Sequence, residues 1–192
     1  MQKSEDSPVE HMPLEEFRIE HIECLPPPGD WDPAFEEDEP VLPPVLMEEE
    51  SGYVLVAHHK SLWWARSASK ISVRAMVVRN PVHIPVAHKT IENCIEEAMF
   101  FDGLLRREIV PNRSRLADML GYSRARITQV LNVLKLPLEI RQRLLLADNI
   151  SEFHLRPLVK IDDEKKQMAF FSKLVSDKLT GRQMALFAAS DE

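Results

Sequence analysis

The sequence has few cysteines and no long apolar run. Cys24 and Cys94 are the two cysteines, and their separation matches no metal-binding spacing. No apolar stretch approaches the roughly 18–20 residues that would span a bilayer. The N-terminal residues also lack the apolar segment of a secretory signal peptide. These absences predict a cytoplasmic protein with no membrane span, no signal peptide and no metal site.

The chain also lacks the positive net charge that is usual for a protein that binds nucleic acid. Its formal net charge is −7, but the charges are unevenly distributed. Residues 1–50 carry a net charge of −14, whereas residues 112–160 carry a net charge of +5. Attraction to phosphate is screened within about 8 Å at physiological salt. The charge near the binding surface, and not the total charge, therefore decides whether a protein attracts DNA. The total charge therefore does not exclude a DNA-binding surface within residues 112–160.

The first 85 residues predict a small α/β domain behind an acidic tail. Residues 1–16 are polar and acidic, which predicts disorder. Residues 26–50 are dominated by proline and acid, which predicts a loop within the domain at 17–85. Apolar runs predict an edge strand near residues 17–22, strands at 53–57 and 71–78, and a short helix at 61–69 that carries Trp63 and Trp64.

From residue 86 onward the apolar spacing becomes helical, which predicts an all-α domain over 86–192. Apolar residues between 91 and 105 predict one long helix that closes with Arg106 and Arg107. A short helix before Gly121 is predicted to end at that glycine, and Ser123 is predicted to cap the next helix. Further helices are predicted to begin near Pro137, Ser151, Asp162 and Thr180.

Residues 112–135 read NRSRLADMLGYSRARITQVLNVLK and predict two short helices joined by a tight turn. Ala117 is small enough for the helices to cross closely, and the spacing of Ile127, Val130, Leu131 and Leu134 gives the second helix one apolar face. The polar residues are of the types that contact phosphates and base edges, and such a helix enters the major groove with its N-terminal end leading. The candidate DNA-binding residues are Arg113, Arg115, Ser123, Arg124, Arg126, Thr128, Gln129 and Asn132. The alternative is an adaptor that uses the helical domain to bind protein.

Five segments in order resemble the central domain of ParB-type partition proteins. They are IEEA at 95–98, RLADMLGYSRARITQVLNVLKLP at 115–137, EIRQRLL at 139–145, ISEFHLRPLVKI at 150–161 and LTGRQMA at 179–185. The resemblance implies an α+β fold, in which a small degenerate ParB-like α/β N-terminal domain precedes an all-α helix-turn-helix domain.

The same resemblance implies sequence-specific binding to a palindromic site in double-stranded DNA. The context would be partition of a plasmid, phage or mobile element, chromosome segregation, or transcriptional repression. The family's C-terminal dimerisation domain is expected to be missing, so a homodimer on DNA would form through the other domains or through the DNA itself. A ParA-type ATPase is an implied partner.

The N-terminal domain of the family binds CTP through a Gly-Glu-Arg-Arg box and a later Glu-Asn-x-x-Arg motif. Here Ala57 replaces the glycine, His58-His59-Lys60 follow it, and Glu96 stands where the later arginine should be. Histidine and lysine hold phosphate less well than arginine, and a carboxylate repels it. The residues that remain as nucleotide candidates are His59, Lys60, Glu92 and Asn93.

These departures predict that nucleotide switching is lost, with no CTP or magnesium cofactor and no catalytic residues. The alternative is a CTP-dependent DNA clamp that hydrolyses CTP. The histidines at positions 58, 59, 83 and 88 fit no metal spacing and are interpreted as surface or packing residues. The acidic segment 1–50 is interpreted as a solubilising tail, with partner binding and competition with DNA as alternatives.

Overall fold

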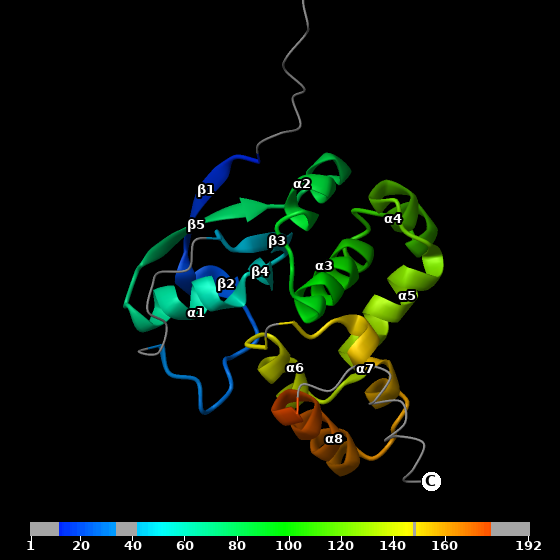
Figure 1. Ribbon diagram of the computed structural model, residues 1–192. Helices are drawn as coiled ribbons and strands as arrows, with labels where there is room; N and C mark the ends of the chain where they lie inside the picture. Colours follow the sequence, from blue (N-terminus) through cyan, green and yellow to red (C-terminus); the bar gives the residue numbers. More distant parts are fainter. Residues whose placement is uncertain (1–11, 34–41, 148, 178–192) are drawn as a thin grey trace, which may run out of the picture.

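The computed structural model describes residues 12–33, 42–147 and 149–177. Most of the predicted disordered tail at 1–16 and the predicted last helix that begins near Thr180 lie outside this part. A five-stranded mixed sheet forms the N-terminal half (Figure 1). Its strands are β1 (Leu14–Arg18), β2 (Ile22–Glu23), β3 (Val45–Glu49), β4 (Gly52–Ala57) and β5 (Ser72–Val77). The prediction of disorder was wrong for residues 14–16, which belong to strand β1 and pair with β5.

The strands lie in the order β1-β5-β3-β4-β2. The pairs β3–β5 and β2–β4 are parallel, and the pairs β1–β5 and β3–β4 are antiparallel. The predicted strands at 53–57 and 71–78 are confirmed as β4 and β5. The run at 17–22 is divided between the two edges of the sheet, because β1 ends at Arg18 and β2 begins at Ile22.

Strand β3 corrects the prediction of a loop at 26–50, in which Val45-Leu46 was expected to form no more than a short extended piece. Val45, Leu46 and Met47 are wholly buried in the middle of the sheet. The strand is hard to recognise in the sequence because Pro43 and Pro44 precede it and acidic residues follow it. Three consecutive apolar residues give no periodicity from which a strand could be predicted. Pairing with β4 and β5, and not the local sequence, makes this segment a strand.

Side chains of the sheet alternate between two buried faces, as the two-residue repeat of a strand requires. Leu46 and Leu55 face α1 (His59–Ser67), whereas Met47 and Val56 face the helical half of the chain. Burial on both faces explains why β4 is almost continuously apolar and why β5 becomes fully apolar after Arg74.

Helix α1 covers one face of the sheet, close to its predicted position at 61–69. Trp63 is buried, and its indole N–H donates a hydrogen bond to the carbonyl oxygen of Leu25 at 2.8 Å. Trp64 is half-buried, with the Lys70 ammonium 4.3 Å from its ring centroid. The two adjacent tryptophans therefore serve packing, one in the interior and one at its edge.

The second half of the described chain is helical, as predicted. Its helices are α2 (Ile84–His88), α3 (Cys94–Arg106), α4 (Arg113–Leu120), α5 (Arg124–Asn132), α6 (Leu138–Leu144), α7 (Glu152–Val159) and α8 (Glu164–Asp177). Helix α7 begins directly after Ser151, as predicted. Helix α8 begins two residues after the predicted Asp162, and Asp163 accepts a capping hydrogen bond from the N–H of Lys166 at 2.9 Å. Among the described helices, none combines the length and apolarity needed to cross a membrane.

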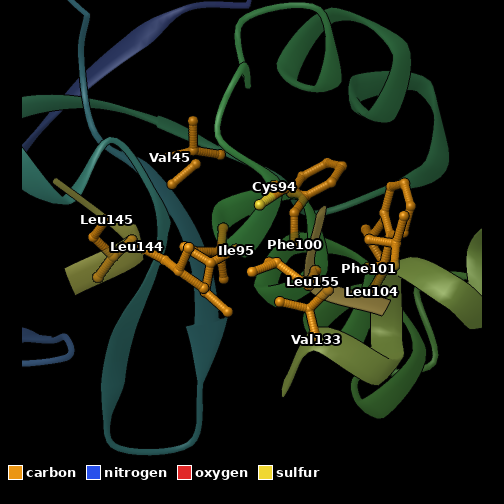
Figure 2. Close-up of a cluster of buried hydrophobic side chains, with 14 of the residues drawn as sticks. Val45, Cys94, Ile95, Phe100, Phe101, Leu104, Val133, Leu144, Leu145 and Leu155 are labelled. Carbon is orange, nitrogen blue, oxygen red and sulfur yellow. The ribbon is translucent and has the colours of Figure 1, made fainter. Parts of the chain in front are cut away.

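One apolar core joins the sheet to the helices. Helix α3 lies between them and contacts both β4 and α5 (Figure 1). Figure 2 shows Ile95 and Phe100 of α3 in one cluster with Val45 of β3 and Leu155 of α7. Because α3 belongs to this shared core, it fixes the position of α5 relative to the sheet.

Candidate nucleic-acid interface

Helices α4 and α5 are joined by the short turn at 121–123, and side chains cap both helices. Asn112 accepts a hydrogen bond from the N–H of Arg115 at 2.9 Å, and Ser123 accepts one from the N–H of Arg126 at 3.1 Å. Gly121 has a φ of +68°, in the left-handed region that glycine enters without strain. The predicted roles of Gly121 and Ser123 are confirmed.

The two helices pack through a small apolar contact. Leu116 and Ala117 of α4 are buried, as are Ile127 and Val130 of α5. Ala117 is 3% exposed, which confirms the prediction that a small residue lies where the helices cross. The opposite side of the pair carries polar side chains.

The eight candidate DNA-binding residues differ in exposure and in their partners. Arg113, Arg115, Ser123 and Arg124 are exposed, whereas Arg126, Thr128, Gln129 and Asn132 are half-buried. In the described part of the chain, no hydrogen bond or ion pair engages the side chains of Arg115, Arg124 or Asn132. Arg115 and Arg124 are therefore cations that a phosphate or a base edge could reach directly.

Arg113 is loosely connected to α5. Its guanidinium lies 3.5 Å from the Thr128 hydroxyl oxygen, at the limit of a hydrogen bond. The Thr128 hydroxyl also donates to the carbonyl oxygen of Arg124 at 3.1 Å, one turn earlier. This contact places the start of α4 against the middle of α5.

Arg126 and Gln129 lie on the flank of α5 that faces α7, which corrects the expectation that they share the solvent-facing side with Arg124. The Arg126 guanidinium donates to Glu97 at 3.0 Å and to Glu152 at 2.9 Å. Arg156 donates to the amide oxygen of Gln129 at 2.8 Å. Base contact by Arg126 or Gln129 stays a prediction.

The sequence analysis missed the residues that hold this flank. They are Glu97 on α3, with Glu152 and Arg156 on α7. The spacing of Glu152 and Arg156 at i, i+4 on one helix is a visible signal of an ion pair. The local sequence does not indicate that Arg126 joins this ion pair, because Arg126 lies 26 residues before Glu152.

The candidate nucleotide residues lie elsewhere, around a cavity of about 670 Å³ between the sheet domain and α6 and α7. Lys60, Glu92 and Asn93 line it, together with His58 and Glu96. Asn93 is a structural residue: its oxygen caps α3 at the N–H of Ile95, and its amide nitrogen donates to the carbonyl oxygen of Leu144 at 2.7 Å. It therefore connects the start of α3 to the end of α6.

His59 does not face the cavity as a free ligand. It is wholly buried, and both its backbone N–H at 2.8 Å and its ring nitrogen Nδ1 at 3.1 Å contact one oxygen of Glu96. Burial alone would raise the pKa of Glu96. Hydrogen bonds from the His59 ring and from the backbone N–H groups of His58 and His59 outweigh burial and hold this pKa below its ordinary value. Glu96 is therefore an ionised carboxylate at the N-terminal end of α1.

This arrangement does not fit a nucleoside triphosphate. Backbone N–H groups at the start of a helix can bind phosphate, but Glu96 already accepts the one from His59. Among the described residues that line the cavity, Lys60 is the one lysine or arginine, and it is outnumbered by the carboxylates of Glu92 and Glu96. A triphosphate would face a net negative wall without an arginine.

The fold and the α4–turn–α5 pair define a helix-turn-helix protein. Residues 92–191, slightly more than half of the chain, match the ParB HTH domain family. The chain belongs to this family of ParB-type partition proteins, and the resemblance described from its sequence is confirmed. Its helical half is therefore a ParB-type DNA-binding domain.

Individual relatives agree with this assignment. The chain is 35% identical to a nucleoid occlusion protein of Geobacillus sp. (strain WCH70) over 89 residues, covering 46% of this chain and 31% of that protein. It is 30% identical to a nucleoid occlusion protein of Oceanobacillus iheyensis over 145 residues, covering 71% and 50%. The chain thus spans from 31% to 50% of the length of these relatives.

A similar solved structure is that of the C-terminally truncated chromosome-partitioning protein ParB from Caulobacter crescentus, complexed to the centromeric parS site. It is 19% identical, with a TM-score of 0.48, and the match covers 92% of this chain and 99% of that chain.

Proposed function

We propose that the chain binds double-stranded DNA sequence-specifically through α4 and α5, in the segregation or the repression of a genetic element. The observation that carries this proposal is the exposed N-terminal end of α5. There, Arg124 follows the Ser123 cap, and its guanidinium has no partner in the described chain. The helix dipole adds further positive potential at the same end. A further relative, the probable chromosome-partitioning protein ParB of Helicobacter pylori, favours segregation as the context.

Arg124 and Arg115 are suited to different contacts. Arg124 is the first residue of α5, the end of a recognition helix that leads into the major groove, and arginine pairs bidentately with guanine. Arg115 lies in the first turn of α4, the helix that crosses the phosphate backbone in this motif. We therefore assign base recognition to Arg124 and phosphate binding to Arg115.

Arg124→Ala should weaken binding to the preferred duplex by about 1–3 kcal/mol and relax the preference at one base position. Arg115→Ala should weaken binding to all duplexes about equally and reduce the salt slope by about one. The duplex is first selected from a random library, and the affinity is then titrated at several salt concentrations. Arg106→Ala is the control, because Arg106 is an exposed arginine on α3 that pairs with Asp102.

Failure of the wild-type chain to bind any duplex in a salt-dependent way would contradict the proposal and favour the protein-binding adaptor. A helix-turn-helix that reads a palindrome requires two copies of the chain, with half-sites about one helical turn apart. We therefore also propose a homodimer on DNA, and a ParA-type ATPase as the partner in segregation.

We further propose that this DNA binding is independent of nucleotide. The position of Glu96 supports this proposal, because its carboxylate takes the backbone N–H that a phosphate would need. Calorimetric titration with CTP and Mg²⁺ should give no binding heat, and added CTP should leave the affinity for the selected duplex unchanged. A saturable heat, or a DNA affinity that shifts with CTP, would favour the CTP-dependent clamp instead.

A further inference from the structure

The carboxylate of Glu152 is the centre of an ion-pair network under the recognition helix. It accepts hydrogen bonds from Arg156 at 2.6 and 2.9 Å and from Arg126 at 2.9 Å. Arg126 also donates to Glu97 at 3.0 Å, and Arg156 also donates to Gln129. Two side chains of α5 are thereby connected to α3 and α7.

The burial of Glu152 distinguishes it from an ordinary first-turn glutamate. Acidic residues are common in the first turn of a helix because the dipole favours them, and they usually remain in water. The Glu152 side chain is instead 1% exposed. Removing a carboxylate from water is costly unless it is fully paired, so Glu152 requires both guanidiniums to stay in place.

The network determines which side chains of α5 are free to contact a ligand in solvent. Residues two apart on a helix lie about 200° apart around its axis. Arg124 and Arg126 therefore project from different sides of α5. Glu97 and Glu152 hold Arg126 inward, and Arg156 fixes the amide of Gln129 with its oxygen toward α7.

We infer that Glu152 is a positioning residue for DNA specificity. By retaining Arg126 and Arg156, it keeps two guanidiniums off the phosphates and fixes how Gln129 is presented to a base edge. Among the arginines of this network and of α5, base recognition is then left to Arg124, and nonspecific attraction to the backbone is limited. This inference rests on the proposed DNA binding of α4 and α5.

Glu152→Gln tests the inference, because glutamine has nearly the same shape but lacks the negative charge that attracts both guanidiniums. Glu139→Gln is the matched control. Glu139 also pairs with an arginine four residues later, Arg143, but on the exposed surface of α6. Both variants remove one negative charge from the chain, and only Glu152→Gln releases the α5 network. Circular dichroism and thermal unfolding verify that both variants are folded.

The readouts are the affinities for the selected duplex and for an unrelated duplex of equal length, across salt, and the base preferences selected from a random library. In Glu152→Gln we expect a salt slope steeper by about one, because a released guanidinium reaches a phosphate. We also expect the ratio of specific to unrelated affinity to fall about tenfold, with a changed base preference. Glu139→Gln should change neither the ratio nor the base preference.

Arg156→Lys provides a second route if Glu152→Gln does not fold. Lysine keeps the charge beside Glu152 but lacks the planar fork that also reaches Gln129. A base preference altered at one position supports the inference. A folded variant of either kind with an unchanged specificity ratio and base preference overturns it, and Glu152 then only stabilises the fold. Absence of duplex binding by the wild-type chain instead removes the proposed function on which the inference rests.

Discussion

Replacing Phe101 by alanine is expected to lower the free energy of unfolding by about 3–5 kcal/mol, the usual cost of deleting a buried phenyl ring. Phe101 is wholly buried on α3, and its ring stacks on His88 with centroids 5.6 Å apart. It belongs to the apolar core that joins the sheet to the helices (Figure 2). The cavity left by the ring cannot collapse easily because both sides of α3 are packed. Urea unfolding followed by circular dichroism measures the loss.

Phe153→Ala is the matched control for this prediction. Phe153 is 53% exposed on α7, where its ring contacts the Arg156 guanidinium at 5.2 Å. Its removal should cost less than about 1 kcal/mol, since it deletes an exposed cation–π contact and little buried area. Equal losses in the two variants would show that α3 is not the central element of the core.

The helical half was predictable from sequence because its signals are local. The caps Ser123 and Ser151 and the left-handed Gly121 each stand within one turn of the helix they limit. The sheet was less predictable because strands depend on distant partners. Strand β3 pairs with β4 and β5, and its apolar run is too short to reveal its place in the centre.

The candidate interface also has residues that the local sequence predicts and residues whose orientation depends on distant contacts. Arg124 was predictable as an exposed residue because it follows a helix cap at the start of α5. Arg126 and Gln129 were placed with it because their residue types suit base recognition. Glu97 and Glu152 hold Arg126 inward, and Arg156 holds Gln129. All three lie on helices that the sequence does not place next to α5. Residue type therefore suggested the chemistry, and tertiary contacts decided which residues are available for it.

Replacing Glu96 by alanine is expected to lower the free energy of unfolding by about 2–4 kcal/mol, because buried donors are then left without an acceptor. The backbone N–H and the ring of His59 both contact this carboxylate, and His59 is wholly buried. The other ring nitrogen of His59, Nε2, has no hydrogen-bond partner in the described chain, so the contact with Glu96 is the one hydrogen bond that this buried ring makes there. Glu92→Ala is the control, because Glu92 is exposed and lines the same cavity. Its effect should lie within about 0.5 kcal/mol.

Glu96→Gln should show the pH dependence of this contact. The pKa of Glu96 is below its ordinary value in the folded chain, so the carboxylate stabilises the fold above the pKa of the unfolded chain, about 4.3. This contribution should be lost as pH falls through the lower folded pKa. The stability difference between the wild type and Glu96→Gln should therefore be constant from about pH 7 to 5 and narrow on further acidification. A difference that stays constant down to pH 3 would mean that the carboxylate contributes through shape and not through its charge.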